Sequence, residues 1–140
     1  MESMIIPKFT VSGYRGVWGS TLNDEIVRKY TQAFIKFLKN DNGKDNPIIL
    51  IGRDGRESGP EIREIIIDEL KNLGAIPIDG DILPTPTVMF SVRKHNYDGA
   101  IIVTASHNPI EYNGLKLVNH KGFFLDFDEA EKINKYYEHS

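Results

Sequence analysis

The segment TASHNP, residues 104–109, contains the side chains in this sequence that are best suited to chemistry. Ser106 follows an apolar run and is flanked by His107 and Asn108, and Pro109 then interrupts the strand. A serine in this setting can act as a reactive hydroxyl, but it can also cap a turn, and Asn-Pro commonly begins one. Residue chemistry alone slightly favours the turn and leaves the type of reaction open.

Two serine-hydrolase arrangements fit this segment poorly. The nucleophile elbow of such enzymes needs Gly-x-Ser-x-Gly, whereas Thr104 and Asn108 stand at the two glycine positions. A Ser-His-Asp triad needs the serine and the histidine to face each other, but neighbouring residues of an extended chain, such as Ser106 and His107, tend to point apart. A serine hydrolase is therefore a disfavoured alternative.

Arginines and glycines in two other segments could contact a phosphate. In SGYRG (12–16), Arg15 lies between two glycines, where the backbone can approach a ligand closely and a guanidinium can pair with phosphate oxygens. In IGRDGRESG (51–59), Arg53 and Asp54 follow a strand and precede a helix start, a position that can cradle a phosphate. This segment lacks the Gly-Lys-Ser/Thr of a P-loop and the spacing of a dinucleotide fingerprint, which favours an Arg-Asp pair that braces neighbouring loops.

The sequence predicts no complete metal site of its own. Asp79-Gly80-Asp81 resembles a cation-binding loop, but no third carboxylate follows it. The four histidines show no ligand spacing. There are no cysteines, so disulfides and thiolate metal sites are excluded.

Composition predicts one globular, water-soluble domain, because the chain has 140 residues, of which 40% are hydrophobic and 26% charged. Seventeen basic and 20 acidic residues give a formal net charge of −3, which argues against a nucleic-acid partner. The longest apolar runs, 48–51 and 100–103, are too short to span a bilayer. Since the N-terminus has no signal-peptide pattern, we expect a cytoplasmic location and no membrane partner.

Apolar periodicity and breaker residues predict an alternation of helices and strands. Helices are expected over 22–38, from a Ser58–Glu61 capping box to about residue 73, from Thr85 or Thr87 to about residue 95, and over 128–140. Strands are expected over 47–52, 75–79, 99–104 and 114–118. Gly74 stands where a left-handed residue would end the second helix.

This alternation predicts an α/β fold, a three-layer α/β/α sandwich with a mostly parallel, mixed sheet. Residues 99–103 are expected to form its central buried strand. Ligands bind at the carboxyl ends of the strands in such sheets, and the polar loops 52–59, 83–87 and 105–113 are expected there.

Four segments, in this order, resemble the α-D-phosphohexomutase family of phosphoglucomutases, phosphomannomutases and phosphoglucosamine mutases. FTVSGYRG is similar to the family's Phe-Gly-Thr-Ser-Gly-x-Arg-Gly, IGRDGRESG to its Gly-Arg-Asp-x-Arg-x-Ser-Gly, LPTPT to its Pro-Thr-Pro turn, and TASHNPIEYNGLK to its phosphoserine loop with the following Asn-Gly-x-Lys. Thr10-Val11 departs from the usual Gly-Thr, and VNHKGFFLD is closer to the phosphoglucosamine mutases. The likeness covers nearly the whole chain.

The resemblance implies that Ser106 carries a phosphoryl group. It would donate this group to a hexose phosphate and take the other phosphoryl group back from a hexose 1,6-bisphosphate intermediate. The implied catalytic residues are Ser106, Arg15, Lys116 and His107, with His107 and Asn108 orienting the serine loop and Ser12, Arg53 and Asp54 supporting the site. Mg²⁺ is the implied cofactor, and Ser106 would bind it through its phosphate.

Enzymes of this family have four domains, and residues 1–140 resemble only the first, the N-terminal domain that bears the phosphoserine. The missing C-terminal domains are therefore expected partners, and they would supply the other metal ligands and the sugar-recognition loop. Alone, the chain is expected to be inactive. The alternative is a non-catalytic binding module that retains the shape of the mutase domain.

Overall fold

The computed structural model describes residues 7–139, which form one five-stranded sheet and four helices. The strands are β1 (Tyr14–Val17), β2 (Ile48–Arg53), β3 (Ile76–Ile82), β4 (Gly99–Val103) and β5 (Tyr112–Val118), and the helices are α1 (Asp24–Asn40), α2 (Gly59–Asn72), α3 (Thr85–His95) and α4 (Phe127–Glu138). The strand order is β1-β5-β4-β2-β3. β2 pairs in parallel with β3 and β4, whereas β5 is antiparallel to β4 and β1, so the predicted mixed and mostly parallel sheet is confirmed.

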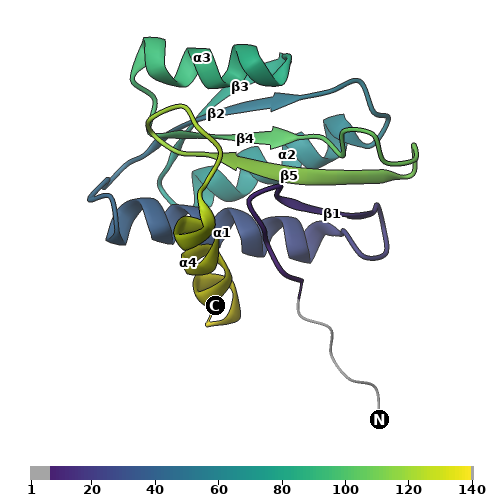
Figure 1. The fold of residues 1–140 in the computed structure, drawn as a ribbon, viewed down its shortest axis with the longest axis horizontal. Coiled ribbons are helices and arrows are strands. Elements are labelled where there is room, and N and C mark those ends of the chain that lie inside the picture. The colour runs from purple at the N-terminus through teal and green to yellow at the C-terminus, as the bar shows by residue number, and fades with distance from the viewer. Residues whose placement is uncertain (1–6, 140) are drawn as a thin grey trace.

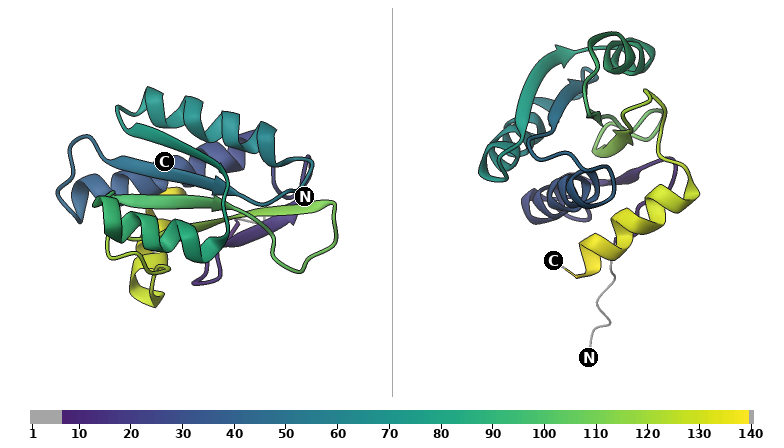
Figure 2. Two further views of the ribbon diagram at one scale, coloured as in Figure 1. Left: turned by 90° about the horizontal axis from the view of Figure 1, so that it is seen from above. Right: turned by 90° about the vertical axis from the view of Figure 1, so that its left-hand side faces the viewer.

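Helices cover both faces of the sheet, which confirms the three-layer α/β/α sandwich. Among the described helices, α3 lies on one face, while α1, α2 and α4 lie on the other (Figure 1). Further views show α1 lying between α2 and α4 in the helical layer on that face (Figure 2). A large apolar core lies on the side of α1, and a smaller one lies between the sheet and α3.

β4 is the central strand, as predicted, and all five of its residues are buried. Its side chains alternate between the two cores: Ile101 and Val103 belong to the larger one, and Ala100 and Ile102 to the smaller one. Burial on both faces is what the uninterrupted apolar run requires. The strand is therefore a rigid base for the loop that follows it.

Local signals in the sequence explain several helix ends. The Asn23 side chain accepts a hydrogen bond from the amide of Ile26 at 3.0 Å and so caps α1. Gly74 has a φ of +76° after the end of α2, as predicted. α4 begins with a complete capping box between Asp126 and Glu129.

The predicted capping box at Ser58 is wrong. Ser58 has helical backbone angles and makes no side-chain cap bond. Its hydroxyl instead accepts a hydrogen bond from Asn113 Nδ2, on β5, at 2.8 Å. The Ser58 hydroxyl therefore bonds to a residue that is distant in sequence and does not cap α2.

Two strands also differ from the prediction. β3 extends to Ile82, beyond the predicted end at residue 79, so Asp81 lies within a strand rather than in a loop. β1 was not predicted at all, because its four residues, YRGV, have no clear alternation of apolar and polar side chains.

Within residues 7–139, no helix is both long enough and apolar enough to cross a membrane.

Tyr30 of α1 lies at the centre of an aromatic cluster. Its ring centroid is 5.4 Å from that of Phe9, 5.5 Å from that of Tyr14 and 4.4 Å from that of Tyr137. The side chain is fully buried, and its hydroxyl has no hydrogen-bond partner within the described part of the chain. Burial raises the pKa of this hydroxyl, so it remains protonated at all ordinary pH values.

Replacing Tyr30 by Phe should not destabilise the domain. The substitution removes a buried polar group that has no partner, so we expect the free energy of unfolding to stay constant or rise by about 1 kcal/mol. Urea denaturation followed by circular dichroism measures this change. Tyr136→Phe is the matched control, because it removes a hydrogen bond to Asp41 Oδ1 at 2.6 Å and should cost about 0.5–1.5 kcal/mol. A loss for Tyr30→Phe as large as that of the control would contradict the interpretation.

Candidate active site

Neighbouring strands bring two cations to the loop that carries Ser106. Ser106 follows β4, Lys116 lies on β5, and Arg15 lies on β1. In the antiparallel pairs, Lys116 is opposite Ile102, and Arg15 is opposite Gly114. Because opposite residues share a face of the sheet, and so do alternate residues of one strand, both cations lie on the face that α3 covers in part.

The Ser106 hydroxyl is held next to the ammonium group of Lys116. Lys116 Nζ donates a hydrogen bond to Ser106 Oγ at 3.0 Å. Arg15 Nη1 donates to Asn108 Oδ1, two residues further along the same loop, at 3.2 Å. Ser106 is exposed and has a φ of +53°, a left-handed conformation that non-glycine residues seldom adopt. The site thus presents a serine hydroxyl to open space with two positive charges near it.

The environment of Lys116 disfavours its positive charge. Burial, and then the charge of Arg15, lower the pKa of the Lys116 ammonium group. The Phe124 ring centroid lies 5.3 Å from Lys116 Nζ, a contact that attracts the cation and offsets part of this cost. An anion bound at Ser106 would compensate both unfavourable effects.

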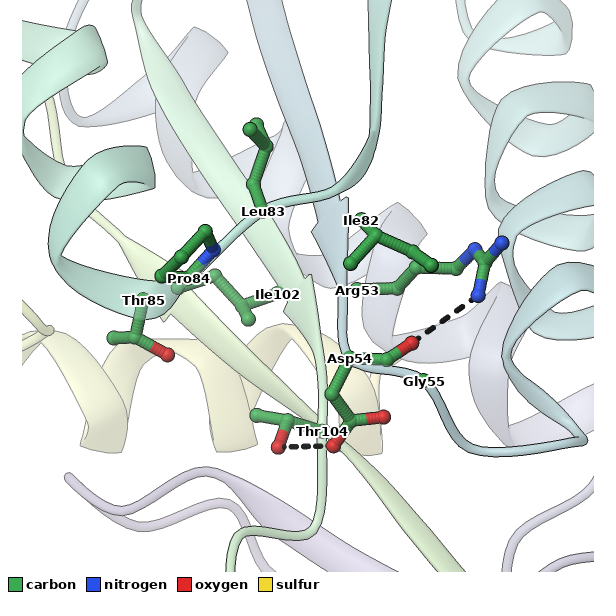
Figure 3. A pocket seen from close by; sticks show the side chains of 9 residues that line it. All are labelled: Arg53, Asp54, Gly55, Ile82, Leu83, Pro84, Thr85, Ile102 and Thr104. Atoms are coloured by element: carbon green, nitrogen blue, oxygen red, sulfur yellow. Dashed lines mark hydrogen bonds between the residues drawn. The ribbon is translucent and has the colours of Figure 1, made fainter.

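The backbone of Ser106 is fixed by the end of β2. The Ser106 amide donates to Thr104 Oγ1 at 3.0 Å. The Thr104 hydroxyl donates in turn to Asp54 Oδ2 at 2.7 Å (Figure 3). Figure 3 also shows Arg53 beside Asp54, where its Nη1 donates to the Asp54 carbonyl oxygen at 3.1 Å. Asp54 therefore supports the serine loop through Thr104, and Arg53 bonds to the backbone of Asp54.

Asp79 and Asp81 face guanidinium groups rather than a vacant space. Asp81 Oδ1 lies 2.8 Å from Arg53 Nη2 and 2.8 Å from Arg63 Nη1, while Asp79 Oδ2 lies 3.8 Å from Arg63 Nε. These carboxylates neutralise the two arginines at the edge of the sheet. They connect β3 to α2 and to the end of β2.

Arg56 was not among the predicted site residues, although it lies in segment 51–59, for which a bracing Arg-Asp pair was predicted. Its guanidinium donates to four carbonyl oxygens, those of Ser106, Asn108, Pro109 and Tyr112, at 3.0, 2.8, 2.7 and 2.9 Å. The only sequence signal for this role was the second arginine of GRDGR. Which carbonyls it would reach depends on the path of a loop fifty residues away.

The side chains of His107 and Ser12 form no hydrogen bond with Ser106 among the described residues. Both are exposed, and the structure gives the His107 ring no hydrogen bond or ion pair with any residue from 7 to 139. The Ser12 amide donates to Thr10 Oγ1 at 3.2 Å, inside a turn that Thr10 and Gly13 close with two backbone hydrogen bonds. A hydrolase-like pairing of Ser106 with His107 is therefore absent from the described residues.

Two hollows open beside the serine loop. One, of about 260 Å³, lies between the ends of β2, β3 and β4 and the start of α3 (Figure 3). The other, of about 400 Å³, is lined by Asp54, Gly55, Arg56, Ser106, Asn108 and Ile110. Ser106 therefore borders a space that a small ligand could occupy.

The described residues do not form a metal site by themselves. Within residues 7–139, no three histidine, aspartate or glutamate side chains are grouped so that they could hold a metal ion. Asp54, which lies between Arg53 and Arg56 in sequence, is one carboxylate near the serine loop. It already accepts hydrogen bonds from the Thr104 hydroxyl and from the Arg56 amide.

Substituting Gly114 should disturb the pairing that places Arg15. A Cβ atom at this position would lie 2.5 Å from the Tyr14 carbonyl oxygen and 2.9 Å from the Thr104 carbonyl oxygen. We expect Gly114→Ala to lower the free energy of unfolding by about 1–3 kcal/mol in urea denaturation, because backbone atoms must move. Gly55→Ala is the control, since a Cβ there has no atom within 4 Å, and it should change stability by less than about 0.5 kcal/mol. Equal effects of the two substitutions would argue against a tight contact at Gly114.

Lys116→Met should stabilise the domain in a pH-dependent way. The folded state lowers the pKa of Lys116, so below that pKa the protonated side chain destabilises the fold, and Met removes this effect. As the pH rises through the folded-state pKa towards the unfolded value, Lys116 loses its proton and the difference from wild type should shrink. Thermal melts of both proteins between pH 7 and 10 measure this difference in stability. Lys121→Met is the control, because Lys121 is exposed. A difference that grows with pH would contradict the sign.

Comparisons with known proteins identify the family of this chain. Residues 7–140 match the family model "Phosphoglucomutase/phosphomannomutase, alpha/beta/alpha domain I". A phosphoglucomutase/phosphomannomutase of Thermococcus kodakarensis is 38% identical over 84% of this chain and 25% of its own length. A phosphoglucosamine mutase of Clostridium kluyveri is 37% identical over 89% of this chain and 27% of its own length.

A solved structure gives the same result. The crystal structure of a phosphoglucomutase/phosphomannomutase family protein from Burkholderia thailandensis superposes with a TM-score of 0.79 and 31% identity, over 94% of this chain and 30% of that one. The chain thus spans between a quarter and a third of the length of these relatives. It belongs to the phosphoglucomutase/phosphomannomutase family and corresponds to the α/β/α domain I of that family.

Proposed function

We propose that this chain supplies the phosphoserine side of a phosphohexomutase active site. Ser106 would carry a phosphoryl group that moves to a hexose phosphate, giving a hexose 1,6-bisphosphate. The other phosphoryl group of this intermediate would then return to Ser106. The observation that supports the proposal best is the exposed, left-handed Ser106 with its hydroxyl 3.0 Å from Lys116 Nζ.

The positive charges suit phosphoryl transfer. Such reactions depend mainly on positioning and on neutralising negative charge, with little other chemistry required from the protein. When the P–O bond to Ser106 breaks, negative charge develops on Oγ, and Lys116 can stabilise that charge or donate a proton to it. Arg15, whose charge already lowers the pKa of Lys116, would pair with oxygens of the transferred group.

Asn108 and His107 have different parts in this proposal. Asn108 would hold Arg15 in place through their 3.2 Å hydrogen bond. His107 is exposed and free to contact a substrate that enters from the solvent side. Arg53, Asp54 and Ser12 would support the surrounding loops without touching the transferred group.

Mg²⁺ and further domains belong to the same proposal. When bound, Mg²⁺ would polarise the phosphoryl oxygens, and the phosphate on Ser106 is the ligand that the described residues offer. Other metal ligands and the sugar-recognition groups would come from C-terminal domains, in keeping with the longer chains of the relatives. A cytoplasmic location, where hexose phosphates are metabolised, completes the proposal.

Phosphoryl transfer to Ser106 can be tested directly. Incubating the full-length protein that contains this chain with Mg²⁺ and glucose 1,6-bisphosphate should add the mass of one phosphoryl group, which peptide mapping should locate on Ser106. Ser106→Ala should take up none. Lys116→Met should slow the uptake by about 100-fold, the usual effect of removing one positioned donor, whereas Lys121→Met should not change it. Uptake at any residue other than Ser106 would refute the assignment.

The 140-residue chain alone should not catalyse the complete reaction, because it lacks the residues that would bind the sugar and complete a metal site. A coupled assay with glucose 1-phosphate should therefore show no turnover above the Ser106→Ala background. Turnover that depends on Ser106 in this chain alone would show that no further domain is needed.

A further inference from the structure

We infer that Arg56 is a positioning residue for the phosphoryl-transfer step, and that it holds Ser106 in the conformation that directs its hydroxyl at Lys116. The inference rests on the proposed function of Ser106. It concerns a residue on the loop before α2, which makes no contact with the Ser106 hydroxyl itself.

The contacts of Arg56 are concentrated on the serine loop. Nη2 donates to the carbonyl oxygens of Ser106 and Asn108, and Nη1 donates to those of Pro109 and Tyr112. These four acceptors lie within seven consecutive residues, 106–112. One guanidinium therefore fixes the path of the whole loop between β4 and β5.

Other arginines of the domain make different contacts. Arg28 and Arg63 bond mainly to carboxylates, and Arg93 donates to a single carbonyl oxygen, that of Gly122. The side chain of Arg56 is only 12% exposed, and its nearest carboxylate oxygen, Asp54 Oδ2, is 3.5 Å from Nε. Its four side-chain hydrogen bonds thus all go to loop backbone, while the buried Nε has no hydrogen-bond partner within residues 7–139.

Ser106 is held at three points, and Arg56 provides one of them. Its amide donates to Thr104 Oγ1, its hydroxyl accepts from Lys116, and its carbonyl oxygen accepts from Arg56. A left-handed serine is a strained conformation that persists only where its surroundings enforce it. Without Arg56, the peptide group that follows Ser106 can rotate. Ser106 could then relax to a negative φ, which would carry its Oγ away from Lys116.

Lysine should not replace Arg56. A guanidinium presents five donors in a fixed plane, so it can reach acceptors on several sides at once. An ammonium group has three donors on one atom and cannot serve four carbonyl oxygens spread along the loop. A role that depended on charge alone would, in contrast, tolerate lysine.

Kinetics of the full-length protein test the inference. Turnover of glucose 1-phosphate, with glucose 1,6-bisphosphate and Mg²⁺ present, should fall at least tenfold in kcat for both Arg56→Lys and Arg56→Gln. KM should change less than about threefold, because a misplaced nucleophile slows the chemical step more than binding. Arg93→Gln, which removes an arginine with one carbonyl partner, should match wild type. A kcat within about twofold of wild type for Arg56→Gln, or full activity of Arg56→Lys, would overturn the inference.

Hydrogen exchange supplies a readout that does not depend on activity. The amides of Ser106, Asn108 and Tyr112 are hydrogen-bonded within the loop, so they should exchange faster in both Arg56 variants. The amides of β4 should keep their wild-type rates, which excludes general unfolding as the cause. Unchanged loop exchange, or equal loss of protection in β4, would contradict a specific positioning role.

Ser106→Ala separates this inference from the proposed function. If Ser106→Ala takes up phosphate as fast as wild type, Ser106 is not the carrier and the proposed function fails, whatever the Arg56 variants do. If Ser106→Ala is inactive while Arg56→Gln is fully active, the proposed function stands and the role of Arg56 is refuted.

Discussion

The antiparallel pairing of β5 between β4 and β1 is the constraint on which the candidate site depends. It sets Lys116 opposite Ile102 and Arg15 opposite Gly114, so that both cations lie on one face beside the end of β4. Because side chains alternate along a strand, a shift by one residue would turn Lys116 into the large apolar core. Burial of Leu115 and Leu117 in that core prevents such a shift. The stability of the core and the geometry of the site are therefore fixed by the same register.

The site places the Lys116 ammonium group where its charge is unfavourable. Lys116 is partly buried and close enough to Arg15 for the two charges to affect each other, and within the described residues no carboxylate neutralises it. The Asp and Glu side chains near the loop have other roles, since Asp54 accepts from Thr104, and Asp81 binds two arginines. The Ser106 hydroxyl therefore faces the positive charges of Lys116 and Arg15, which favours an anionic group on its oxygen.

Features encoded by neighbouring residues were predictable, and features that depend on distant segments were not. Asn23 caps α1 and Gly74 ends α2 because each acts on the chain within a few residues of itself. Ser58 failed as a cap because Asn113, far away in sequence, takes its hydroxyl. β1 was missed for the same reason: four residues with little periodicity form a strand only because β5 offers them an edge.

The sequence by itself determined the α/β class, the buried central strand before Ser106 and, through four ordered motifs, the family of the chain. These follow from side-chain periodicity and from residue types, which can be read without coordinates. Only the tertiary structure decided that Ser106 is left-handed, that Lys116 reaches its hydroxyl, that His107 points to solvent and that Arg56 fixes the loop backbone. The physical reason is that these contacts join segments about 10 to 50 residues apart, and their geometry depends on how the strands pair and the loops pack.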